Sequence, residues 1–160
     1  MDNKIDLAPG FMIRVLQQVS VSIFHSSLES EELTPIQHTI LKTAAANKDL
    51  DQSTIASLAF LDASTTGDVV KRLEKRGLLS REVSEMDRRS RVVNITRQGR
   101  QLLKRVSGKI EAAQNFLLSP LAPAERDRFL ASLEKILVFH ENIGSDEISG
   151  PWQRGNKKLS

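Results

Sequence analysis

Apolar residues recur along the first part of the chain with the period of an amphipathic helix. Between residues 9 and 30 they follow the spacing i, i+3, i+4, i+7 and i+11, at Met12, Val15, Leu16, Val19 and Ile23. This spacing puts one apolar stripe on one helix face. The sequence therefore predicts a long N-terminal helix that begins at about Pro9 and ends near Ser30.

The segment Thr34-Pro35-Ile36-Gln37 carries a strong helix-start signal. Thr34 can cap the helix, Pro35 fits the first helical position, and Gln37 completes a capping box with Thr34. The second predicted helix then runs to about Ala46.

Two further helices are predicted before the period changes. Asp51 can cap a short helix that runs through about Phe60, and either Asp62 or Ser64 can cap the next one, which Gly77 ends. Two short helices joined by a tight polar turn form a helix-turn-helix pattern. Because many helical pairs share this pattern, it is weak evidence when taken alone.

After Gly77 the period becomes two, which is typical of strands. Apolar and polar residues alternate from Leu79 to Val83, and Val93 and Ile95 resume the alternation after a polar stretch at 84–90. The simplest interpretation is an antiparallel hairpin with a long charged tip, which Val93 and Ile95 fasten to the core. A helix-turn-helix followed directly by such a hairpin is a winged helix.

Two more helices are predicted after the hairpin. Thr96 can cap a long helix with an apolar stripe, and after two prolines a last helix runs to about Gly144. The tail at 145–160 is polar and contains glycine, so we expect it to be flexible, with Trp152 as one residue that could anchor it. The fold class expected is mainly α with a small β-hairpin (α+β).

Charge is distributed unevenly over the 160 residues. The net charge is +3, but the segment from Asp62 to Arg105 carries twelve Lys and Arg against six Asp and Glu, while residues 111–147 are net negative. A localised basic segment indicates a surface that binds a polyanion. The alternative is an ordinary solvated helix face.

Composition excludes several classes of function. With no cysteine there is no disulfide, catalytic thiolate or Cys-based zinc site, and a cytoplasmic location is favoured. His25, His38 and His140 lack metal-ligand spacing, so neither a metal nor another cofactor is expected. The motifs of serine hydrolases, phosphate-binding loops and zinc proteases are absent, which argues against an enzyme. The sequence also shows no signal peptide and no apolar run near the ~20 residues of a membrane span.

The basic segment supplies the candidate DNA contacts. In a helix-turn-helix the N-terminal residues of the second helix meet base edges in the major groove, and arginine at a wing suits phosphates or a narrow minor groove. Thr66 is the candidate for a base contact, Arg88 or Arg89 for the groove, and Arg91 for a phosphate. The full predicted set is Ser64, Thr65, Thr66, Gly67, Asp68, Lys71, Arg72, Lys75, Arg88, Arg89 and Arg91.

Three stretches, LTPIQHTIL, TTGDVVKRLEKRGLLSR and DRRSRVVNITRQGRQLL, resemble the MarR family of bacterial transcriptional regulators, over about Leu33 to Leu103. The resemblance implies a homodimeric winged helix-turn-helix protein. Such proteins usually repress transcription and release DNA when a small, often anionic aromatic, ligand binds. No membrane partner is implied.

The resemblance and the pattern together suggest four regions. Residues 1–32 would form an N-terminal dimerisation helix, 33–100 the DNA-binding domain, 101–144 the C-terminal dimerisation helices and 145–160 the tail. The outer helices carry more apolar surface than a small core can absorb, which favours a homodimer over an ordinary intrachain core. Two-fold symmetry would place two recognition helices ~34 Å apart on a near-palindromic operator.

The sequence departs from the family at the recognition helix. Many members have Thr-Val-Thr-Arg where this chain has Thr65-Thr66-Gly67-Asp68. Gly67 would let the helix approach DNA closely, at a cost of roughly 1 kcal/mol in helix propensity. Asp68 could accept a hydrogen bond from a cytosine amino group, or it could orient Arg72 one turn later.

The family's effector pocket lies between the dimerisation helices and the DNA-binding lobe. Arg14 could pair with an aromatic carboxylate there, with Phe11 and either His25 or His38 nearby. The plainer alternatives are a surface charge for Arg14, a core position for Phe11 and interface positions for the histidines. An alternative function for the whole chain is a winged helix that contacts another protein instead of DNA.

Overall fold

The computed structural model describes residues 8–83 and 91–142. The predicted hairpin tip at 84–90, with Arg88 and Arg89, and the predicted tail at 145–160, with Trp152, lie outside the described residues. The helices are α1 (Pro9–Leu28), α2 (Pro35–Ala46), α3 (Gln52–Leu58), α4 (Ala63–Lys75), α5 (Arg97–Leu117) and α6 (Pro123–Asn142), with a short 3-10 helix at Glu29–Glu31. The strands are β1 (Leu50–Asp51), β2 (Leu79–Val83) and β3 (Arg91–Ile95).

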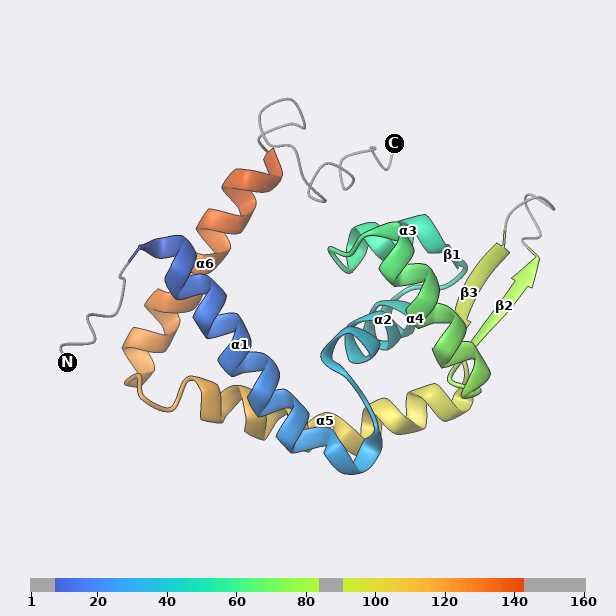
Figure 1. Cartoon of the computed structure of the whole chain (residues 1–160), viewed down its shortest axis with the longest axis horizontal. Coiled ribbons are helices and arrows are strands. Elements are labelled where there is room, and N and C mark those ends of the chain that lie inside the picture. Colours follow the sequence, from blue (N-terminus) through green and yellow to red (C-terminus); the bar gives the residue numbers. More distant parts are fainter. Residues whose placement is uncertain (1–7, 84–90, 143–160) are drawn as a thin grey trace.

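The elements form two groups (Figure 1). One group holds α2, α3, α4 and the sheet. The other holds α1, α6 and the C-terminal half of α5, and α1 packs along α5. The predicted fold class, mainly helical with a small antiparallel sheet, is confirmed. Among residues 8–83 and 91–142, none of the helices combines the length and apolar character that crossing a bilayer requires.

Side-chain caps start the helices where the sequence predicts them. The capping box of Thr34 and Gln37 is present at α2. Asp51 accepts a 2.8 Å hydrogen bond from the Thr54 amide, and Thr96 accepts one of 3.1 Å from the Gly99 amide. At α4 the cap is Asp62, so the choice left open between Asp62 and Ser64 is settled. These caps satisfy amides that a helix cannot pair internally.

The sheet contains one strand that the periodicity does not indicate. The hairpin strands β2 and β3 pair antiparallel as predicted, with Leu79 opposite Ile95, but β1 also pairs with β3, with Leu50 opposite Val93. Two residues are too few to show a period. The pairing is completed by Asn94, whose side chain accepts a 2.9 Å hydrogen bond from the Asp49 amide.

Helix α3 ends earlier than predicted. Its last helical residue is Leu58, and the chain then turns through Phe60, which has a φ of 53°. A positive φ cannot continue a right-handed helix. The turn between α3 and α4 therefore begins two residues before the predicted end at Phe60.

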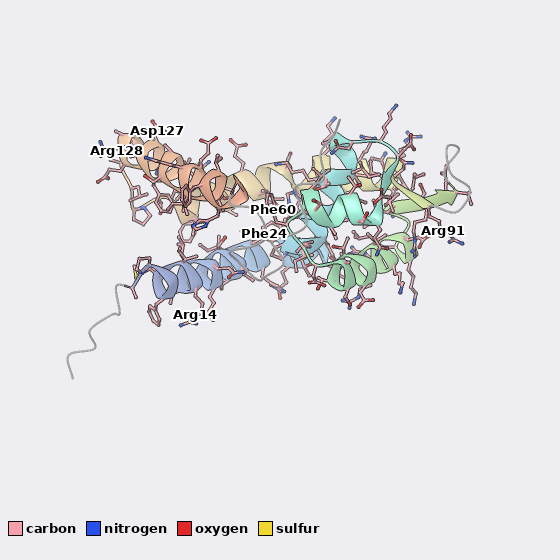
Figure 2. All side chains as sticks on the ribbon, turned by 90° about the horizontal axis from the view of Figure 1, so that it is seen from above. Arg14, Phe24, Phe60, Arg91, Asp127 and Arg128 are labelled. Atoms are coloured by element: carbon pink, nitrogen blue, oxygen red, sulfur yellow. The ribbon has the colours of Figure 1, made fainter. Side chains whose placement is uncertain are left out.

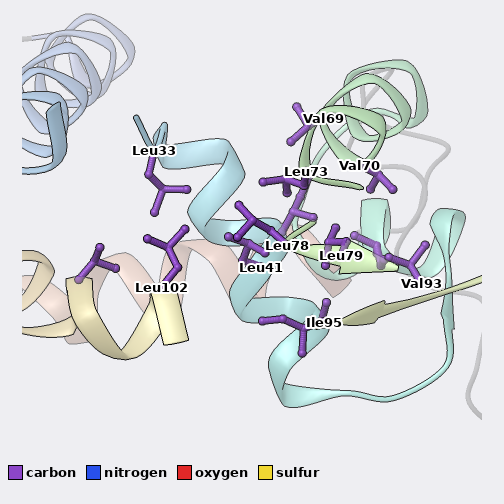
Figure 3. Close-up of a cluster of buried hydrophobic side chains, with 14 of the residues drawn as sticks. Leu33, Leu41, Val69, Val70, Leu73, Leu78, Leu79, Val93, Ile95 and Leu102 are labelled. Carbon is purple, nitrogen blue, oxygen red and sulfur yellow. The ribbon is translucent and has the colours of Figure 1, made fainter. Parts of the chain in front are cut away.

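The hydrophobic core sits among α2, α4, the sheet and the first part of α5 (Figure 3). Val93 is 1% exposed and Ile95 is 8% exposed, which confirms that they fasten the hairpin to the core. The other fully buried large apolar side chains come from α1, α2, α3, α4 and α5, namely Leu28, Ile40, Leu41, Ile55, Val70, Leu73 and Val106. The core thus supports α4 and the hairpin from behind.

A close contact joins the end of α4 to the start of α5. Gly77 has a φ of 70° and ends α4, and the Leu78 amide donates back to the Leu73 carbonyl over 2.9 Å. Thr96 ties this turn to α5 because its hydroxyl donates to the Gly77 carbonyl over 2.7 Å. A Cβ at Gly99 would lie 2.3 Å from the Leu78 carbonyl oxygen, so only glycine fits there.

The outer helices leave apolar side chains exposed. Helix α6 makes only slight contact with the rest of the described chain. Large apolar side chains that water reaches are found on α1, on α6 and at the end of α5, at Phe11, Met12, Ile13, Leu16, Val19, Val21, Phe116, Leu130, Ile136, Leu137, Val138 and Phe139.

Candidate nucleic-acid interface

Helix α4 presents one polar face to solvent and one apolar face to the core. Val69, Val70 and Leu73 point inward and are at most 8% exposed. The exposed polar residues lie on the other face, and three of them are cations. These residues are Ser64, Asp68, Lys71, Arg72 and Lys75. Of the predicted DNA contacts on α4, these five are the ones that the structure places on one accessible surface.

The start of α4 is held by Asp62 and Thr65. The Asp62 carboxylate accepts from the Thr65 hydroxyl over 2.6 Å and from the Thr65 amide over 2.8 Å. These hydrogen bonds, with the hydroxyl contributing most, lower the pKa of Asp62. Thr65 is half-buried, and because its proton is directed to Asp62, only its oxygen lone pairs remain for a further partner.

The structure corrects the predicted role of Thr66. Its side chain is 0% exposed, and its hydroxyl donates to the Asp62 carbonyl over 2.8 Å. A buried hydroxyl with its donor satisfied cannot reach a base edge. Thr66 therefore belongs to the packing of α4 and not to the contact surface.

Gly67 also faces inward, contrary to its predicted role in a close approach to DNA. The residue is buried, and a Cβ at this position would lie 2.8 Å from the side-chain nitrogen of Gln52, at the start of α3. Gly67 therefore faces the neighbouring helix rather than solvent.

The neighbouring Asp68 remains exposed. Within the described residues no hydrogen bond or ion pair joins Asp68 to Arg72, so the structure gives no sign that this carboxylate orients the guanidinium. The other interpretation of Asp68, acceptance from a base amino group, stays a prediction.

An ion pair that no sequence pattern predicted links α4 to the hairpin. The Arg81 Nε atom of β2 donates to the Glu74 carboxylate of α4 over 2.8 Å. The Arg81 side chain is 19% exposed and that of Glu74 is 36% exposed, so solvent screens the pair only in part. The pair fixes the base of the hairpin against α4. Two opposite charges on either side of the Gly77 turn were the available signal.

Arg91 is exposed at the start of β3, opposite Val83 in the register of the hairpin. It is the described cation nearest in sequence to the hairpin tip. Figure 2 shows it at the hairpin, at the opposite end of the molecule from Arg14 and α6. Arg88 and Arg89, the other predicted wing contacts, lie outside the described residues.

Three of the four candidate effector residues, Phe11, Arg14 and His25, lie on α1. The Arg14 guanidinium lies 4.9 Å from the centroid of the Phe11 ring, and its Nη1 atom is within 3.5 Å of the Gln18 side-chain oxygen. Arg14 and His25 border the same open groove along α1, whose full lining is Arg14, Gln17, Gln18, Val21, Ser22, His25 and Ser26. Phe11 is 37% exposed, so it is not a core residue of this chain.

His38 lies apart from that groove. Its ring centroid is 5.6 Å from that of Phe24, and it borders a different hollow with Lys42 and Leu58. Burial lowers the pKa of His38, and the nearby Lys42 charge lowers it further. The half-buried ring thus favours its neutral form.

Comparison with known proteins identifies the class. The sequence model of the MarR family matches residues 33–90. A putative transcriptional regulatory protein for the hcr operon of Thauera aromatica is 30% identical over 128 residues, which cover 79% of this chain and 77% of that protein. Relatives of this kind are transcriptional regulators and not enzymes.

Solved structures agree over most of the chain. The Bordetella bronchiseptica regulator BpsR, described with regulation of its DNA binding by 6-hydroxynicotinic acid, is 26% identical with a TM-score of 0.79 over 83% of this chain and 95% of that one. The repressor CouR bound to a 23-mer DNA duplex is 27% identical, with a TM-score of 0.77 over 81% of this chain and 92% of that one. Because it has the helix-turn-helix, the hairpin and these likenesses, the chain belongs to the MarR family of DNA-binding transcriptional regulators.

Proposed function

We propose that the protein is a ligand-responsive repressor that binds a near-palindromic operator as a homodimer. The observation that carries this proposal is the outward face of α4, which combines Lys71, Arg72 and Lys75 with two polar residues near the helix start. The core supports this face from behind, and the Glu74–Arg81 pair holds the hairpin beside it. A helix with these features suits the major groove.

The exposed residues fall into two kinds of contact. Ser64 and Asp68 lie toward the N-terminal end of α4, where base edges are read, and the Asp68 carboxylate suits the amino group of a cytosine. Lys71, Arg72 and Lys75 follow along the helix and suit phosphates. Arg91 of the hairpin is the fourth candidate for a phosphate contact, on the DNA backbone beside the adjacent groove.

The proposed dimer rests on the exposed apolar side chains of α1, α5 and α6. Phe116 is 65% exposed, Leu130 50% and Phe139 62%. Apolar surface of this extent marks interaction sites, and a second copy would bury it across a two-fold axis. Static light scattering at micromolar concentration should give twice the chain mass of 17.9 kDa. A monomer at that concentration would remove the basis of the proposal.

The proposed effector is a small aromatic carboxylate. Arg14 is exposed and placed over an aromatic ring, so it can pair with a carboxylate while Phe11 contacts the ligand ring. His25 and Gln18 border the same groove and can bind ring substituents. The regulation of the relative BpsR by 6-hydroxynicotinic acid supports this choice of class.

A mobility shift tests DNA binding. The duplex is the region upstream of the chain's own gene, at two salt concentrations. Binding through several phosphates should weaken steeply with salt, with log K falling by ~0.9 per contact for each unit of log salt. A protein-contact winged helix is the alternative function, and no shift at low salt would favour it.

Titration of the protein–DNA complex tests the effector. 6-Hydroxynicotinic acid and benzoic acid should release the duplex, whereas nicotinamide, which lacks the carboxylate, should not. Arg14→Ala should abolish the response and keep the shift itself, because Arg14 is far from α4 (Figure 2). Equal responses to acid and amide, or an unchanged Arg14→Ala response, would contradict the assignment.

A further inference from the structure

The turn between α1 and α2, residues 29–34, contacts both groups of elements. It contains the 3-10 helix at Glu29–Glu31 and Glu32, whose φ is 50°. We call these six residues the junction. Its polar contacts reach α5 on one side and the end of α4 on the other.

On the α5 side, Glu31 binds two cations. Its carboxylate lies 2.9 Å from the Lys109 Nζ atom and 3.0 Å from the Arg105 Nε atom, and Lys109 also donates to the Ser30 hydroxyl over 3.0 Å. The Glu31 side chain is 12% exposed, whereas those of its partners are 42% and 60% exposed. These hydrogen bonds, that of Lys109 first, lower the pKa of Glu31.

On the α4 side, Arg76 binds the junction backbone. Arg76 caps the C-terminus of α4, and its guanidinium donates to the Glu32 carbonyl over 2.8 Å and to the Glu31 carbonyl over 3.3 Å. It also lies 3.4 Å from the side-chain oxygen of Gln37, which accepts from the Thr34 amide in the capping box of α2. One guanidinium thus joins the last turn of α4 to the junction and to α2.

Glu31 therefore takes part in both sets of contacts, through its side chain with α5 and through its carbonyl with Arg76. Apolar packing through α2 also connects α4 and α5. Hydrophobic packing is non-directional, however, whereas charged hydrogen bonds fix distance and angle. The junction therefore adds directional contacts between α4 and the α1–α5 pair to the Thr96–Gly77 hydrogen bond, which holds the end of α4 to the start of α5.

We propose that Glu31 and Arg76 are positioning residues that set the separation and angle of the two recognition helices in the dimer. This inference rests on the proposed function, because it requires that α1, α5 and α6 pair two copies on one operator. Neither residue touches DNA. Loss of the junction contacts should leave α4 intact but allow it to swing relative to its symmetry mate.

The test is the dependence of affinity on half-site spacing. The best duplex is selected from a random pool with wild-type protein, and variants of it move the half-sites apart or together by one and two base pairs. One base pair changes the separation by ~3.4 Å and the facing angle by ~35°. The affinity of the wild-type protein should fall steeply when the half-sites are shifted. In Glu31→Gln the ratio of the affinities for the best and the shifted duplex should be roughly tenfold smaller, as expected for lost charged hydrogen bonds.

Control variants isolate the junction. Glu29→Gln removes the same charge from the same turn, at an exposed residue, and should keep the wild-type spacing dependence. The double substitution Arg105→Gln with Lys109→Gln removes the other side of the contact and should flatten the dependence as Glu31→Gln does. The exchange of Glu31→Lys with Lys109→Glu should restore it only in part, since the ion pair with position 109 re-forms in reverse while Arg105 then lies beside a like charge.

The outcomes separate the two proposals. If wild-type protein binds with steep spacing dependence and both Glu31→Gln and the double substitution Arg105→Gln with Lys109→Gln retain it, the positioning inference is overturned and the proposed function stands. A uniform loss of affinity at every spacing, with a lower Tm, would show a merely structural role and would also overturn the inference. If wild-type protein selects no duplex, the proposed function fails and the inference with it.

Discussion

Helix α4 and helix α6 expose side chains of opposite chemistry. On α4 the large apolar side chains are buried and the large exposed ones are polar or charged, so this helix is complete within one chain. On α6 Leu130, Ile136 and Leu137 are each about half exposed, at 50%, 50% and 51%. Exposed charge is stable in water, whereas exposed apolar surface gains free energy when it is covered. The exposed face of α4 is thus suited to an anion, whereas the apolar surface of α6 is suited to an apolar partner.

The largest expected effect concerns the exposed apolar surface of α6. Leu137→Asp places a charge on the apolar surface of α6 and should give a monomer. Operator affinity should fall by about 10²–10⁴-fold, since the second half-site contact is no longer linked to the first. Light scattering and a mobility shift measure both effects.

Ala131→Asp is the matched control for that substitution. Ala131 is exposed on α6 among the polar residues Asp127, Arg128, Glu134 and Lys135, at i±3 and i±4. The same added charge should leave a dimer there. A monomer from both variants, or a dimer from both, would contradict the assignment of the apolar surface as the interface.

The next effect separates the two halves of α5, which spans both groups of elements. Gly99→Ala should destabilise the fold by about 1–3 kcal/mol or more, because the added Cβ meets the Leu78 carbonyl. Gly108→Ala, with nothing within 4 Å of the added Cβ, should stabilise the helix by about 0.5–1 kcal/mol. Urea denaturation gives the free energy of unfolding of each variant. If both substitutions changed it in the same direction, the close contact at Gly99 would not be rigid.

A comparable effect should distinguish the exposed and buried residues at the start of α4. Asp68→Ala should alter base preference at one position of each half-site by about 1–3 kcal/mol. Thr66→Val should leave base preference unchanged and cost about 1 kcal/mol of stability, because only a buried hydrogen bond is lost. Selection from a random duplex pool measures preference. A changed preference for Thr66→Val would restore Thr66 to the contact surface.

The smallest expected effect is on the salt dependence. Arg91→Ala should weaken binding to all duplexes alike and reduce the slope of log K against log salt by ~0.9. Arg128→Ala removes the same charge from α6, at the other end of the molecule (Figure 2), and should not change the slope. A slope that Arg91→Ala leaves unchanged would remove Arg91 from the DNA contacts.

Local signals predicted the elements well. The caps at Thr34, Asp51 and Thr96, the stop at Gly77 and the period of two in the hairpin are each written in neighbouring residues, and each was confirmed. Such signals work because a cap or a turn is satisfied within about four residues of the chain.

The candidate site was predicted less completely. Periodicity placed Val69, Val70 and Leu73 inside, but it did not separate Thr66 and Gly67 from the exposed residues beside them. Their burial depends on the helices that pack against α4, namely α2 and α3. No pattern within α4 reports where its neighbour lies.

Patterns of neighbouring residues were enough to predict the order of the helices and of the two hairpin strands, their caps, the basic segment and the class of regulator. The three-dimensional packing was needed to find which α4 residues face solvent, that Leu50 and Asp51 join the sheet, that Glu74 binds Arg81, and that the junction contacts both α4 and α5. The difference arises from the distance along the chain between the interacting residues. Caps and periods are interactions between near neighbours, whereas strand pairing and contacts such as Arg76 with Glu32, 44 residues apart, exist only when the packed core brings remote segments together.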